Sequence, residues 1–215
     1  MVLAVVRGVV GFSLGIASAA FIAYAFEAGA DMGKYSSYGS LGWIFGALGA
    51  ALVGDIHLLF WLSFLVCLAA FLISLFFKDV PSYRSSLPPR LWPVLIRNYR
   101  IYLAVFLRHL GATAVWIILP LYLAGLGLNQ FWIGLLWGIN FIVQFIVMRC
   151  LQQFSASKVF ACGQLLSILV FLAYAFAAGK LSLIAVNALL GVAWSCLYVG
   201  ALVIVLQSGE ERGTA

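Results

Sequence analysis

The chain has 215 residues, of which 66% are hydrophobic and only 8% are charged. Soluble domains usually carry about 25% charged residues, so the composition excludes an ordinary water-facing domain and predicts an apolar surface that meets lipid. The net charge of +6 does not indicate nucleic-acid binding, because the cations lie between apolar segments rather than on one basic face.

Seven apolar segments follow one another along the chain. Each is close to the roughly 20 residues that cross a bilayer as a helix. Segments embedded in lipid must satisfy their own backbone hydrogen bonds, and these are too long for barrel strands. The sequence therefore predicts an all-α fold, a polytopic membrane helix bundle of about seven transmembrane helices. The segments cover 2–26, 38–54, 57–77, 101–125, 130–148, 159–178 and 181–206.

The connections between the segments alternate in charge. One set, at 27–37, 78–100, 149–158 and 207–215, holds nearly all the lysines and arginines outside the spans, whereas the other set holds only Lys180. Cytoplasmic loops are enriched in these cations, which places the first set in the cytoplasm and the amino terminus outside. We expect a multi-pass protein of the plasma membrane. Because an outside start without a cleavable signal is unusual, we also expect the chain to be a fragment.

The basic segment 78–100 is the one long connection, and it divides the chain. It contains prolines, serines and five cations, and it separates three spans in 1–77 from four spans in 101–215. Its later part, around Trp92 and Ile96, is amphipathic and is expected at the membrane interface.

A weak repeat relates the two ends of the chain. A shift of 180 residues places Gly11 on Gly191 and aligns "GADMGK" at 29–34 with "GEERGT" at 209–214. Parallel repeats of this kind occur in transporters built from two similar helical bundles, and the period implies six spans per unit.

Small residues at intervals of four, as at Gly11 and Gly15 and at Gly42 and Gly46, form helix faces that a neighbouring helix can approach closely. The loop after the first span carries an acidic residue, a glycine and a lysine within "DMGK" at 31–34. In these motifs the chain resembles the major facilitator superfamily of secondary transporters, from the fourth to the tenth of twelve helices. The resemblance implies that 1–77 ends a first six-helix bundle, that 101–215 begins a second, and that the missing helices belong to the same protein or to a second chain. The motif and packing residues are Arg7, Gly11, Gly15, Asp31, Gly33, Lys34, Gly42, Gly46, Gly191, Glu211 and Gly213.

The stretch "FLRHLGATAVWIILPLYL" at 106–123 sets Arg108 and His109 inside an apolar span without an acidic residue. Arg108 lies about 12 Å along the span from Arg100, too deep for easy access to water. Such a charge should face protein or a water-filled cavity. Two interpretations remain open: Arg108 binds backbone carbonyls beside a packed His109, or both residues serve a cavity in which His109 is the candidate titrating group.

Polar and aromatic residues gather on the fourth, fifth and seventh spans. The family resemblance implies that these spans border a substrate cavity, whereas plain interhelical hydrogen bonding is the alternative for each amide or hydroxyl. The candidate cavity residues are Arg108, His109, Thr113, Trp116, Trp137, Asn140, Gln144, Asn187, Trp194 and Tyr198.

These features predict a secondary transporter that moves a small solute by alternating access, with Arg108 favouring an anionic or carbonyl-bearing substrate. The alternative is a non-transporting membrane interaction protein or a transporter remnant. We expect no enzyme, because no catalytic motif is present, and no cofactor or metal, because the four cysteines are isolated. The expected partners are a small-molecule substrate and the lipid bilayer.

Overall fold

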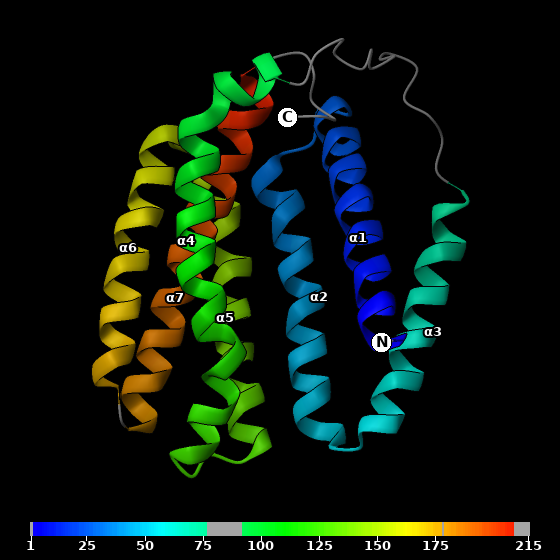
Figure 1. The fold of residues 1–215 in the computed structure, drawn as a ribbon, viewed down its shortest axis with the longest axis vertical. Coiled ribbons are helices and arrows are strands. Elements are labelled where there is room, and N and C mark those ends of the chain that lie inside the picture. Colours follow the sequence, from blue (N-terminus) through cyan, green and yellow to red (C-terminus); the bar gives the residue numbers. More distant parts are fainter. Residues whose placement is uncertain (1, 77–91, 178, 209–215) are drawn as a thin grey trace.

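The computed structural model describes residues 2–76, 92–177 and 179–208 (Figure 1). Within these ranges the chain is helical and contains no strand, and seven helices are long and apolar enough to cross a membrane. The predicted polytopic helix bundle is confirmed. Residues 78–91, Glu211 and Gly213 lie outside the described ranges. The long helices are α1 (Val2–Glu27), α2 (Met32–Val53), α3 (Ile56–Ser74), α4 (Trp92–Gly125), α5 (Gln130–Cys150), α6 (Ala156–Phe176) and α7 (Lys180–Gln207).

Side-chain caps explain where several helices begin. The carboxylate of Asp31 accepts a hydrogen bond from the backbone N–H of Lys34 at 2.8 Å, and Asp55 and Asn129 cap α3 and α5 in the same way. These acceptors satisfy N–H groups that the first turn leaves unpaired. The Asp31 cap starts α2 at Met32, six residues before the apolar segment that hydropathy predicts.

Helix α4 also begins earlier than the apolar pattern predicts. It starts at Trp92, so residues 92–100 of the predicted linker form its first turns. Pro93 fits there because the first turn of a helix needs no N–H from that residue. The extension places Arg108 near the middle of a 34-residue helix.

The helices form an unevenly packed bundle (Figure 1). Helices α4 to α7 lie together, α2 runs beside them, and α1 and α3 lie on the far side of α2. Half of the most apolar stretch of α7 is buried, whereas none of the corresponding stretch of α3 is. We call the end that carries the α1–α2 and α5–α6 connections the basic end, because Lys34, Arg149 and Lys158 lie there.

Glycines allow the central helices to approach closely. A Cβ atom built on Gly191 of α7 would lie 2.6 Å from the carbonyl oxygen of Asn140 in α5, and one on Gly134 of α5 would lie 2.5 Å from the Cβ of Ala51 in α2. Gly163 of α6 likewise abuts the backbone of Leu197 in α7. Backbones this near leave no room for a side chain, so glycine is required at these positions.

The small-residue faces predicted from the sequence are not the faces at which these helices meet. A Cβ atom on Gly11, Gly15, Gly42 or Gly46 would meet nothing within 4 Å. Helix α2 instead contacts α5 through a different face, in which Gly33 abuts the carbonyl of Met148. Within the described ranges, therefore, the glycine ladder at 42 and 46 has no close helix neighbour.

Candidate functional site

A chain of buried polar groups joins three helices. The Ser40 hydroxyl of α2 donates to Oε1 of Gln144 at 3.3 Å, and Nε2 of Gln144 donates to Oδ1 of Asn140. Nδ2 of Asn140 then donates to the backbone oxygen of Asn187 in α7 at 3.3 Å. Both amides have partners, so these groups hold α2, α5 and α7 in register.

Arg108 is buried, and no residue in the described ranges gives it an anionic partner. Only 8% of its surface is exposed, and its guanidinium carbon lies 4.8 Å from the centroid of the Trp194 ring. Nε and Nη2 have no hydrogen-bond partner among the residues that the structure describes. The Trp194 face attracts the charge, but it leaves these two donors unsatisfied. The interpretation that backbone carbonyls hold these two nitrogens is therefore not supported.

His109 also contacts Trp194. Its Nδ1 lies 2.8 Å from the carbonyl oxygen of Val105, which can only accept, so Nδ1 is the donor in this contact. The imidazole packs edge-on against Trp194 with the ring centroids 5.5 Å apart. Trp194 also stacks on Tyr198 at 5.8 Å. Arg108 and His109 diverge around α4, yet Trp194 contacts both.

The Arg108 cavity is a pocket of about 230 Å³ between α2, α4, α5 and α7. Its helices come from both sides of the basic segment 78–100. Drug-sized ligands usually occupy pockets of about 300–1,000 Å³, so this cavity suits a small solute. The lining residues are Trp43, Arg108, Trp116, Trp137, Asn140, Phe141, Gln144, Leu190 and Trp194.

The structure brings together part of the predicted cavity set. Four predicted residues lie outside the lining. Thr113 is exposed, His109 and Tyr198 pack against Trp194, and Asn187 is buried where its Nδ2 donates to the Leu183 carbonyl at 2.8 Å. The predicted residues that line the cavity are Arg108, Trp116, Trp137, Asn140, Gln144 and Trp194.

Sequence reasoning missed the contribution of α2. Trp43 lines the cavity, and Ser40 anchors the polar chain from the same helix. The signal was present, since Ser36, Ser37 and Ser40 form a polar stripe that ends one turn before Trp43. Phe141 was missed because a phenylalanine beside Asn140 is unremarkable in an apolar span.

At the basic end, a side-chain hydrogen bond joins α2 to α5. Nε of Arg149 donates to the Ser37 hydroxyl at 3.2 Å, and its guanidinium carbon lies 4.4 Å from the Phe145 ring centroid. The side-chain amide of Gln152 lies against the Asp31 carboxylate. The motif residues Asp31 and Gly33 thus belong to a helix–helix seam, whereas Lys34 and Arg7 are exposed.

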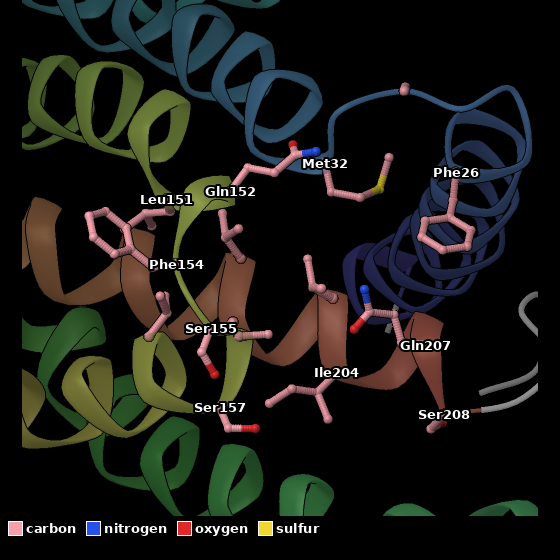
Figure 2. A pocket seen from close by; sticks show the side chains of 16 residues that line it. Phe26, Met32, Leu151, Gln152, Phe154, Ser155, Ser157, Ile204, Gln207 and Ser208 are labelled. Carbon is pink, nitrogen blue, oxygen red and sulfur yellow. The ribbon is translucent and has the colours of Figure 1, made fainter.

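A larger pocket of about 710 Å³ lies at the basic end (Figure 2). Phe26, Met32 and Gln207 face it, together with Ser155 and Ser157 at the start of α6. No charged side chain lines it among the residues that the structure describes. The smaller Arg108 cavity is the better candidate site, because it alone of the two contains a buried charge with unsatisfied donors.

The fold and the span lengths define a multi-pass integral membrane protein. Comparison with protein-family models, curated proteins and solved structures finds no match for the chain. In the parts of the chain that the structure describes, no group of three or more His, Cys, Asp or Glu residues is placed to hold a metal ion.

Proposed function

We propose that the chain belongs to a secondary transporter of the major facilitator type, which moves a small anionic or carbonyl-bearing solute by alternating access. The observation that carries the proposal is the burial of Arg108, with two unpaired donors, in a cavity between helices from both sides of the basic segment. Transporters built from two bundles place their substrate sites at such an interface near the bilayer midplane.

Energetics favour a negative ligand at Arg108. An arginine at the bilayer centre costs at least about 2.5–3.5 kcal/mol. The cation–π contact with Trp194 returns about 2 kcal/mol, whereas each unsatisfied buried donor costs about 1–3 kcal/mol. The net free energy of burying Arg108 stays unfavourable until a hydrogen-bond acceptor reaches Nε and Nη2. An anion or carbonyl oxygen of the solute meets this need.

The apolar surfaces of α1 and α3 support further partners in the membrane. No residue of α3 is buried, and its exposed side chains include Phe60, Trp61 and Phe64. Such a surface is stable only against lipid or other apolar helices. We assign it to the bilayer and to further helices of the same protein or of a second chain, in the plasma membrane.

A second candidate function is a membrane interaction protein that does not transport. The exposed surface of α3 favours it, since a helix without a buried residue is available for pairing with another chain. Saturable solute uptake separates the two candidates, because a pure interaction protein has none.

We expect purified protein in liposomes to take up at least one small solute saturably. The test panel consists of radiolabelled lactate, pyruvate, benzoate and glucose, and empty liposomes provide the background.

Alternating access also requires α2 and α5 to separate at the end opposite the basic end, where Nε2 of Gln130 donates to the Ala50 carbonyl at 3.0 Å.

A short reducible thiol cross-linker between cysteines in the Ala50→Cys, Gln130→Cys protein should therefore stop uptake, and reduction should restore it. The singly substituted proteins, treated with the same reagent, are the controls. Saturable uptake of no panel solute would reject the transport proposal for these solutes and favour the interaction protein. Uptake that continues at full rate in the cross-linked protein would contradict alternating access.

Orientation is testable at two exposed serines. Ser157 lies at the basic end and Ser182 at the opposite end. We expect an impermeant thiol reagent added outside intact cells to label the Ser182→Cys protein and not the Ser157→Cys protein, each with its native cysteines replaced by alanine. Labelling of both proteins in lysed cells is the control. The reverse pattern in intact cells would place the basic end outside.

A further inference from the structure

We propose that the Arg108 cavity binds a monocarboxylate with a flat, aromatic body, of which benzoate is the simplest probe. This inference rests on the proposed function and specifies the chemical class of its substrate. Three features of the cavity carry it: the unpaired edge of the guanidinium, the lack of a second charge among the described lining residues, and the aromatic walls.

The two unpaired nitrogens of Arg108 lie on one edge of its guanidinium. By the geometry of arginine, the N–H of Nε and one N–H of Nη2 lie in the plane of the guanidinium and point in parallel from the same edge. Two parallel donors match the two oxygens of a carboxylate, which gives a bidentate pair. The surrounding protein shields both nitrogens from water, so a carboxylate reaches this edge only after neighbouring side chains move apart.

The cavity neutralises one negative charge. Arg108 is the only charged side chain in its lining, as far as the described residues show. Asn140 and Gln144 are neutral. Gln144 donates to Asn140, and Asn140 donates to the backbone oxygen of Asn187. A second carboxylate on the ligand would be buried without a counter-charge, which is strongly unfavourable. The charge balance therefore favours a monoanion over a dianion.

Aromatic rings form most of the remaining wall. Trp137 and Phe141 are nearly parallel with ring centroids 5.8 Å apart, Trp43 lies 5.4 Å from Phe141, and Trp116 lies 5.7 Å from Trp137. Rings of this kind pack well against a flat apolar body, by offset stacking or edge to face. A bare inorganic anion would leave these walls without contact. The volume of about 230 Å³ suits a body about the size of one ring.

Arg108 also determines whether the cavity favours an anionic or a cationic ligand. A cage of several aromatic rings often binds a quaternary ammonium ion. Here the guanidinium repels a cation, because it is buried beside the same rings and has no anionic partner in the described part of the chain. The same walls that would otherwise favour a cation therefore favour the apolar part of an anion.

The test is equilibrium binding of radiolabelled benzoate to the purified protein in lipid nanodiscs, with unlabelled competitors. We expect benzoate to bind, and we expect benzamide, acetate and phthalate each to compete at least about tenfold less well, since each lacks the charge, the ring or the single charge. Tetramethylammonium should not compete. Equal competition by benzamide or acetate, or tighter binding of phthalate, would overturn the proposal, as would the absence of benzoate binding.

Variants separate the charge from the walls. Arg108→Lys keeps the charge but loses the fork, so benzoate binding should weaken about tenfold or more. Phe141→Leu should weaken benzoate and leave the weak binding of acetate unchanged. Arg7→Gln, at an exposed arginine of α1, is the matched control and should bind normally. Thermal unfolding of each variant reports whether it is folded, and an Arg108→Lys protein that is folded and binds benzoate normally contradicts the bidentate pair.

The outcomes distinguish this inference from the proposed function. Saturable uptake of another panel solute without benzoate binding would leave the transporter standing and reject the aromatic monocarboxylate. Benzoate binding without uptake of any solute would leave the site standing and reject transport.

Discussion

Replacing Arg108 with glutamine should reduce solute uptake into liposomes at least about tenfold without lowering the thermal stability of the protein. Hydrogen bonds to a charged group contribute about 1.5–3 kcal/mol, and about 1.4 kcal/mol corresponds to a factor of ten. Glutamine offers two donors but no charge, so it cannot neutralise a buried anion. Initial rates with a radiolabelled panel solute that the wild-type protein takes up measure the effect.

The stability of the same variant separates a substrate role from a packing role. Within the described part of the chain Arg108 is a buried charge with two unsatisfied donors, so its removal should leave the melting temperature unchanged or raise it. A lower melting temperature with normal uptake would instead identify Arg108 as a packing residue held by Trp194. The Arg7→Gln protein should match the wild type in both measurements.

Replacing Gly163 with alanine should destabilise the bundle by about 1–3 kcal/mol, because overpacking of a tight interface forces backbones apart. A Cβ at this position would overlap the backbone of Leu197, and it would lie 2.9 Å from the carbonyl carbon of Cys196. Backbone cannot rotate away as a flexible side chain can. The melting temperature in detergent should therefore fall by several degrees.

Gly46→Ala and Gly111→Ala are the matched controls. Both glycines are helical, and a Cβ on either meets nothing within 4 Å. Alanine is favoured over glycine in a helix interior by about 1 kcal/mol, so both variants should be as stable as the wild type or more stable. If Gly46→Ala lowers the melting temperature as much as Gly163→Ala, the face of α2 that carries Gly42 and Gly46 meets another helix after all.

Composition and segment length were sufficient to predict the fold class. Seven apolar segments without room for a charged surface leave only helices in lipid, and the structure has seven such helices in its described ranges. Arg108, Asn140 and Gln144 were also predictable as cavity candidates, because a charge or amide inside an apolar span must face protein or water. The helix starts were harder to predict, because α2 begins at Met32 and α4 at Trp92, within segments that hydropathy assigns to loops.

Only tertiary packing decided which helix faces meet. Helical spacing groups Gly42 with Gly46 correctly, but an all-apolar helix has no polar side to indicate which face turns inward. The helices come together instead at Gly134, Gly163 and Gly191. Helix α2 packs on α5 at Gly134, and Trp43 of α2 lines the Arg108 cavity. These choices depend on how several helices fit at once, and no periodicity within one segment contains that information.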